Sequence, residues 1–430
     1  MSKLKDKLNQ IYHQENQDHG GKQDQNPEIR KQLNRLYRNR ENKIKSRQNQ
    51  RPNFKKLIDE MGGKFIKEEE QELILVADRF DMLDKYGEID LREIYNYTQK
   101  DYYQYLHIQN IKYPEQLLFI DTETTGLAGG TGTIAFLVGI GWIEKEVFHL
   151  QQYFLPEFKS EDLMLKKIAE KIENFSALVS YNGKSFDIPL LTSRYLLNKQ
   201  KPILENYPHI DLLHPNRSLW RYSSDNCKLQ TIEGDKIGLY REDDIPGELI
   251  PAVYFNYINN RGKLQQVVNI FEHNRLDIIS MLANLICLFQ SFKHSGPSEN
   301  PLEDFAKGRH FKKRKEIKRS IRHYENVLQS DITENRRFKT LMELAGVYKK
   351  EKEYEKAVPL WEKAADMDFP AVKPLVELAK YYEHKVKDFQ KAIQWTENAL
   401  EIVDEEDVTT LAKLNKRLKR VQRKNKKRDK

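Results

Sequence analysis

The segment Leu117–Gly126 is an apolar run that ends in Asp-Thr-Glu and is then broken by Thr-Thr-Gly. Such a run predicts a buried strand. Alternate residues of a strand face the same side, so Asp121 and Glu123 should project together from its end. Neighbouring carboxylates repel each other and are costly to desolvate. The pair therefore predicts either a site for a hard divalent cation, Mg²⁺ or Mn²⁺, or a strand end whose two acids are simply hydrated.

A second acidic segment, residues 180–187 (Ser-Tyr-Asn-Gly-Lys-Ser-Phe-Asp), lies downstream. The apolar residues 177–179 precede it, and a helical pattern of apolar residues follows it. The segment is therefore interpreted as a strand, a turn and a helix start, with Asp187 near the helix N-terminus. In that position Asp187 serves a site or only caps the helix.

The third segment, residues 271–281, has the apolar spacing of a helix with one buried side. His273 and Asp277 are four residues apart, so they share a face of that helix. A pair at this spacing forms either part of a site or an ordinary surface hydrogen bond.

In this order, the three segments resemble the motifs of the DEDD exonuclease superfamily, whose members have a ribonuclease H-like fold. Asp121 and Glu123 match the first motif, Asn182 and Asp187 the second, and His273 and Asp277 the third. The spacing of the third motif is typical of the superfamily's tyrosine branch, whereas its histidine is typical of the other branch, so His273 departs from the pattern. The resemblance covers roughly residues 115–292. With the Thr-Glu-Thr-Thr-Gly-Leu-Ala-Gly-Gly phrase and the helical repeats described below, it is closest to the YprB-like group of predicted nucleases.

The resemblance implies a metal-dependent 3′–5′ exonuclease that hydrolyses phosphodiester bonds of nucleic acid with two Mg²⁺ or Mn²⁺ ions. Asp121 would bridge both ions, Glu123 and Asp277 would complete the ion that activates water, and Asp187 would hold the second ion largely through water. His273 would orient or deprotonate the attacking water. The same resemblance leads us to expect a nucleic acid substrate, DNA or RNA, bound by a single-stranded end.

Other polar residues near these motifs are candidates for contacts with the substrate. We predict that Thr122, Thr124 and Asn182 bind it. The glycine-rich residues 129–133 form either a phosphate contact or a tight turn. The acidic residues 242–244 are interpreted as an exposed loop rather than as metal ligands.

The pattern of apolar segments predicts an α/β domain with a mixed sheet flanked by helices. The expected strands are residues 117–121, 134–143, 147–155, 177–181 and 210–213, and a helix is expected over residues 160–174 with Ser160 as its N-cap. We expect five parts: a basic, disordered extension (1–57), a small α+β lead-in segment (58–113), the ribonuclease H-like domain (114–295), helical repeats (301–410) and a basic tail (411–430).

The region after residue 301 contains an internal repeat. Leu344-Ala345 recurs as Leu378-Ala379, and Ala357 recurs as Ala392, offsets of 34 and 35 residues. These offsets match the tetratricopeptide period. About three helix pairs are expected, and their grooves would bind a protein partner. The basic residues 312–315 and the basic C-terminal helix also allow contact with nucleic acid.

The composition indicates a chain with a conventional core and polar extensions, because 39% of its residues are hydrophobic and 32% are charged. The formal net charge is +8, with basic residues gathered at both ends. Such ends attract nucleic acid or merely solubilise the chain. No apolar run approaches the roughly 20 residues that cross a bilayer, no secretory signal is visible, and the two cysteines are interpreted as free thiols, so we expect a cytoplasmic protein without a membrane partner. Two other functions stay open: a catalytically silent scaffold that binds nucleic acid, and a protein adaptor that acts through the repeats.

Overall fold

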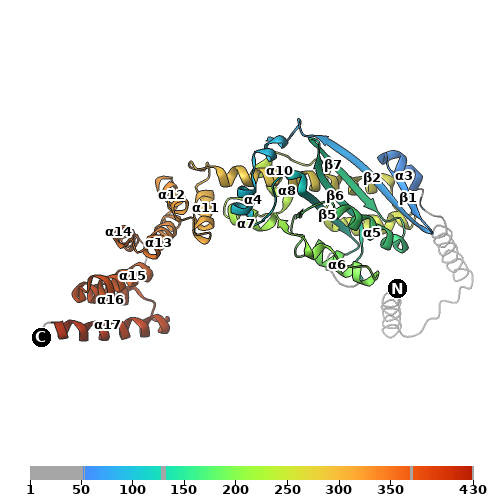
Figure 1. The fold of residues 1–430 in the computed structure, drawn as a ribbon. Helices are drawn as coiled ribbons and strands as arrows, with labels where there is room; N and C mark the ends of the chain where they lie inside the picture. The colour runs from blue at the N-terminus through green and yellow to red at the C-terminus, as the bar shows by residue number, and fades with distance from the viewer. Residues whose placement is uncertain (1–51, 53, 127–131, 369–370, 429–430) are drawn as a thin grey trace, which may run out of the picture.

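A computed structural model describes residue 52 and residues 54–126, 132–368 and 371–428. Most of the expected N-terminal extension, and most of the glycine-rich segment 129–133, lie outside the described residues. The described chain has two parts: a sheet domain, and an arm of helices that extends from one end of it (Figure 1).

The strands have the following bounds: β1 Lys64–Glu68, β2 Gln71–Asp81, β3 Lys85–Tyr86, β4 Ile89–Asp90, β5 Leu117–Thr124, β6 Ala135–Glu144, β7 Val147–Phe154, β8 Ala177–Ser180 and β9 His209–Asp211. The α-helices have these bounds: α3 Phe54–Met61, α4 Gln99–Leu106, α5 Glu161–Ile172, α6 Asp187–Leu197, α7 Leu213–Trp220, α8 Leu229–Ile232, α9 Ile250–Ile258, α10 Leu264–Lys293, α11 Pro301–Lys313, α12 Ile317–Gln329, α13 Glu334–Lys350, α14 Tyr354–Ala365, α15 Val372–Tyr381, α16 Phe389–Ile402 and α17 Val408–Arg428.

The main sheet of the described residues has seven strands in the order β1-β2-β7-β6-β5-β8-β9. β8 and β9 run parallel to β5, whereas the other neighbouring pairs are antiparallel. The expectation of a mixed sheet flanked by helices is confirmed. The lead-in segment 58–113 is not separate from this sheet, because β1 and β2 extend it beyond β7.

The two faces of β5 belong to different layers of the domain. Leu117 and Phe119 pack with the C-terminal half of α10, whereas Leu118 and Ile120 pack with α5 and α6. Continuing this alternation, Asp121 and Glu123 fall on the side of α10, and Thr122 falls on the side of α6. The end of β5 is therefore the place where side chains from both layers can meet.

Two glycines of β6 let α10 lie close to the sheet. A Cβ atom on Gly139 would be 2.1 Å from Asn274 Oδ1 and 2.3 Å from Ile278 Cδ1, and one on Gly141 would be 2.6 Å from Ile278 Cγ2. Gly139 pairs with Asp121 across the ladder. Its lack of a side chain thus sets how near α10 comes to the carboxylates of β5.

We expect Gly139→Ala to lower the free energy of unfolding by about 1–3 kcal/mol, because the added methyl group overpacks the contact with Asn274 and Ile278. Urea unfolding curves measure this loss. Gly247→Ala is the matched control, since a Cβ atom there meets nothing within 4 Å. Equal stability of the two variants would contradict the close approach.

The apolar length of α10 differs from the expectation that no segment is long enough to cross a membrane. By length and composition this helix could span a bilayer, but 72% of its most apolar 18-residue window is buried inside the structure. α10 is therefore a core helix of the sheet domain.

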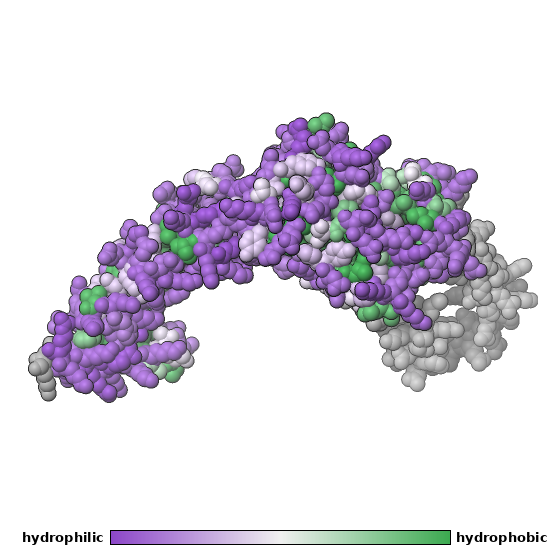
Figure 2. Space-filling model, viewed as in Figure 1, coloured by the Kyte–Doolittle hydropathy of each residue, from purple (hydrophilic) through white to green (hydrophobic). Residues whose placement is uncertain are grey.

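The helical arm consists of successive helix pairs, in which α11 packs on α12, α13 on α14 and α15 on α16. The surface of the arm is mainly hydrophilic in the view of Figure 2. The expected basic tail is largely helical: α17 packs on α16 and holds buried Glu383 through Arg417, Arg420 and Lys424 at 2.6–2.8 Å. Three of the basic groups of the tail are thus paired within the protein.

The expectation for Ser160 has a mixed outcome. Ser160 does stand at the N-cap position of α5, but its hydroxyl accepts a hydrogen bond from the backbone of Glu72 rather than from the helix. In the lead-in segment, Tyr97 and Tyr105 belong to the core: Tyr97 stacks on Phe289, and Tyr105 stacks on Phe292.

Candidate functional site

The end of β5 brings the first two motifs together. The hydroxyl of Thr122 donates a hydrogen bond to Oδ1 of Asp187, the first residue of α6. The preceding turn is fixed by Asp211 at the end of β9, which accepts backbone hydrogen bonds from Asn182 at 2.8 Å and from Lys184 at 3.1 Å. Asn182 has a φ of 67°, which asparagine tolerates better than most residues. Asp187 is therefore held in place from two sides.

The third motif reaches the same place from α10. His273 Nε2 is 3.9 Å from Glu123 Oε1 and 3.7 Å from Asp277 Oδ2. His273 and Asp277 share a face of the helix, as their spacing predicts, and this face is turned toward β5. The five expected catalytic residues thus gather where β5, α6 and α10 meet.

Asn274, which is not among the predicted site residues, binds Asp121 directly. Its Nδ2 donates to Asp121 Oδ2 at 2.8 Å, while its Oδ1 accepts from Gln152 at 2.9 Å. Asn274 is fully buried. It stands four residues before buried Ile278, and a polar residue at such a position is the signal that could have identified it.

Arg241, from the irregular segment before α9, also enters the site. Its guanidinium binds Glu233 at 2.5 and 2.8 Å, Asp277 at 2.5 Å and Asp244 at 3.1 Å. The Arg241 side chain is only 4% exposed. One buried cation therefore joins three carboxylates, among them a residue of the third motif.

The interpretation of residues 242–244 as an exposed acidic loop is wrong for Asp244. Glu242 and Asp243 are exposed, but Asp244 accepts a hydrogen bond from His273 Nδ1 at 2.8 Å. The direction of this bond follows from the carboxylate, which can only accept. Asp244 thereby orients the imidazole so that Nε2 faces Glu123 and Asp277.

The site concentrates negative charge in a poorly solvated place. Burial, followed by the charges of Asp277 and Asp187, raises the pKa of Asp121 well above its ordinary value. Burial and the neighbouring charge of Asp121 do the same to the pKa of Glu123, and burial raises the pKa of Asp187 to about 6. Burial lowers the pKa of His273, but the bond to Asp244 and the charge of Asp277 outweigh it, so the net shift is upward.

The donor set suits a hard divalent cation, because it consists of carboxylates whose mutual repulsion such an ion would relieve. In the part of the chain that the structure describes, however, no group of three His, Cys, Asp or Glu side chains is already arranged to hold an ion. Internal partners explain this: Arg241 holds Asp277, Asn274 holds Asp121, and Thr122 holds Asp187. The carboxylates are therefore suited to a divalent cation, but in this structure Asp121, Asp187 and Asp277 form hydrogen bonds or ion pairs with protein groups instead.

All three residues expected to bind substrate have internal partners: Asn182 through its backbone N–H, and Thr122 and Thr124 through their side chains. Thr122 binds Asp187, and Thr124 donates to the carbonyl of Gly126 at 2.8 Å. The structure shows no substrate, so the contacts expected of Thr122, Thr124 and Asn182 stay predictions.

Comparisons with known proteins place this domain. A family model described as the RNase_H superfamily matches residues 118–287. An uncharacterized protein, YprB of Bacillus subtilis (strain 168), is 32% identical over 313 residues, which cover 72% of this chain and 75% of the relative. Among solved structures, the family B DNA polymerase of Pyrobaculum calidifontis is 10% identical with a TM-score of 0.34, over 57% of this chain and 30% of the polymerase. A TM-score this low carries no inference about function.

Proposed function

The chain belongs to the family of YprB and has an RNase H superfamily domain, and on this basis we propose that it is a metal-dependent nuclease that hydrolyses phosphodiester bonds of nucleic acid. The observation that carries the proposal is the convergence of five residues of three separated motifs, Asp121, Glu123, Asp187, His273 and Asp277, at the end of β5. More specifically, we propose that the chain removes nucleotides from a 3′ end with the help of two metal ions. This part of the proposal rests on the resemblance to the DEDD superfamily.

Each group has a defined part in the proposed reaction. Asp121, Glu123, Asp187 and Asp277 would hold the Mg²⁺ or Mn²⁺, which supplies Lewis acidity and an activated water when bound. The Nδ1–H of His273 donates to Asp244, so Nε2 is the ring nitrogen that would accept a proton from the attacking water. Asn274 fixes the rotamer of Asp121, and Thr122 fixes that of Asp187.

The experiment that tests the proposal is digestion of end-labelled single-stranded and duplex DNA and RNA by the purified chain, with Mn²⁺, with Mg²⁺ or with EDTA. We expect metal-dependent products that shorten from the 3′ end of at least one substrate. Cleavage within the strand would support the assignment as a nuclease but contradict exonuclease action. If the pure protein binds these substrates but cleaves none of them with either metal, the assignment as a nuclease fails.

We also propose that the helical arm is a tetratricopeptide-type domain. The pairing of α13 with α14 and of α15 with α16 coincides with the 34- and 35-residue offsets of the sequence.

A scaffold that binds nucleic acid without catalysis is the second candidate function. The observation that favours it is the ion pair between Arg241 and Asp277, because this pair occupies an expected metal ligand.

A further inference from the structure

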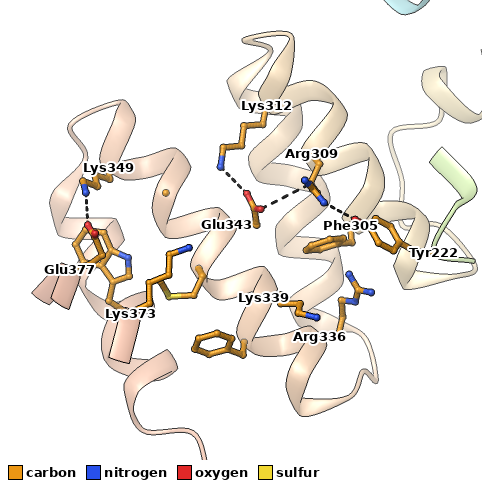
Figure 3. A pocket seen from close by; sticks show the side chains of 14 residues that line it. Tyr222, Phe305, Arg309, Lys312, Arg336, Lys339, Glu343, Lys349, Lys373 and Glu377 are labelled. Carbon is orange, nitrogen blue, oxygen red and sulfur yellow. Dashed lines mark hydrogen bonds and ion pairs between the residues drawn. The ribbon is translucent and has the colours of Figure 1, made fainter. Parts of the chain in front are cut away.

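A groove of about 610 Å³ lies on the helical arm, against the edge of the sheet domain (Figure 3). Its walls come mainly from α11, α13 and α15, the first helices of three successive pairs. Tyr222, which follows α7 of the sheet domain, closes one end of the groove, and α11 packs against α7. The groove therefore continues from the domain that carries the candidate active site.

The charge of the groove is strongly positive. Six cationic side chains line it, namely Arg309, Lys312, Arg336, Lys339, Lys349 and Lys373. Two carboxylates oppose them, and both are already held by lysines: Glu343 by Lys312 at 2.7 Å and Glu377 by Lys349 and Lys380. An excess of about four positive charges is left, spread over three helices.

Three of the cations are available to an external anion. Among the described residues, no acidic side chain forms an ion pair with Arg336, Lys339 or Lys373, and the two lysines are exposed. Burial, together with the nearby charge of Arg309, lowers the pKa of Arg336. An anion that entered the groove would thus relieve a repulsion between cations.

The groove also offers flat surfaces. The guanidinium of Arg336 lies over the ring of Phe305 at 4.3 Å and over that of Tyr222 at 5.0 Å. Arg221 lies over the Tyr222 ring at 4.5 Å. Guanidinium planes and aromatic rings stack on bases, whereas an acidic peptide needs only the charges. Charges repeated along successive helices also suit a backbone with a repeated phosphate.

We propose that this groove is a second binding site for single-stranded nucleic acid, which holds the strand outside the candidate active site. The proposal rests on the proposed function for the identity of that strand, which would be the substrate's own single-stranded flank. Lys339 and Lys373 would neutralise phosphates, and Arg336 with Tyr222 would present a stacking surface.

The test measures the binding of a fluorescein-labelled oligothymidylate of about 20 nucleotides to the full chain in EDTA, by fluorescence anisotropy over a series of salt concentrations. Because hydrolysis is not needed, binding is measured apart from catalysis. The variant is Lys339→Gln with Lys373→Gln. The control is Lys318→Gln with Lys363→Gln, which removes the same charge from exposed positions on α12 and α14, outside the groove.

For two lost phosphate contacts, the affinity should fall by about 20-fold at about 0.1 M salt, and the slope of log K against log salt should become smaller by about 1.4. The control variant should bind like the unmodified chain. Equal affinities and slopes for the groove variant and the control would overturn the proposal. Tighter binding of a polyglutamate peptide of equal length, lost in the groove variant, would overturn it in favour of an acidic protein partner.

The two proposals fail in different ways. If the unmodified chain binds the strand through the groove but cleaves nothing with Mn²⁺, the nuclease assignment fails and the groove stands. If the chain cleaves nucleic acid while the groove variant binds unchanged, the groove assignment fails alone.

Discussion

Asp121→Asn is expected to abolish metal-dependent hydrolysis, by at least about 10³-fold, while the fold stays intact. Asparagine has the same shape and keeps an oxygen that can accept the hydrogen bond from Asn274, but it lacks the charge that would hold the ion. Rates on the substrate identified by the digestion experiment measure this loss. Asp243→Asn makes the same chemical change at an exposed position of the loop that carries Asp244, so it should keep full activity.

The same variant is also expected to change how stability depends on pH in EDTA. Burial and neighbouring charges raise the pKa of Asp121 in the folded chain, so ionising this carboxyl destabilises the native state as pH rises above its unfolded value of about 3.9. The substituted amide cannot ionise, and the stability of the variant relative to the unmodified protein should therefore increase from about pH 4 upward.

In the activity experiment, hydrolysis by the Asp121→Asn variant at the normal rate would remove Asp121 from the mechanism.

Arg241→Met is expected to destabilise the chain by about 3–5 kcal/mol, the largest loss of stability that we predict. The side chain of Glu233 is 1% exposed and would be left buried without its cation. Guanidinium chloride unfolding measures the difference. Arg217→Met on α7 is the control, because Arg217 is exposed, and it should cost no more than about 0.5 kcal/mol.

A double variant separates the buried charge from a general packing defect. Adding Glu233→Gln to Arg241→Met removes the orphaned carboxylate, so part of the lost stability should return. Additive effects of the two substitutions would show that Arg241 does not act through Glu233.

The main parts of the candidate site could be predicted because they follow regular periods. Asp121 and Glu123 are two apart on a strand, and His273 and Asp277 are four apart on a helix, so local geometry places each pair on one face. The five strands expected between residues 117 and 213 also lie within three residues of the observed bounds at each end. The sheet and the placement of its motifs are therefore predictable from local patterns.

The remaining contacts depend on irregular or distant segments. Arg241 and Asp244 lie between short helical turns, with no period that would indicate which side chains turn inward. Similarly, the sequence assigns β1 and β2 to a separate segment, since nothing local shows that β2 pairs with β7. The docking of the basic tail could not be predicted either, because its partner, Glu383, lies on a different helical segment.

The 30 residues of α10 run without interruption from the candidate active site to the arm. Asp277 stands near the middle of this helix, and Phe292 near its end packs against His310 and Phe311 of α11. At 1.5 Å per residue, about 22 Å of rigid rod separate Asp277 from Phe292. Helix α10 is thus a direct mechanical connection between the arm and the candidate site. A force that displaces α11 would be transmitted along this helix, so a nucleic acid strand pulled against the arm would shift Asp277.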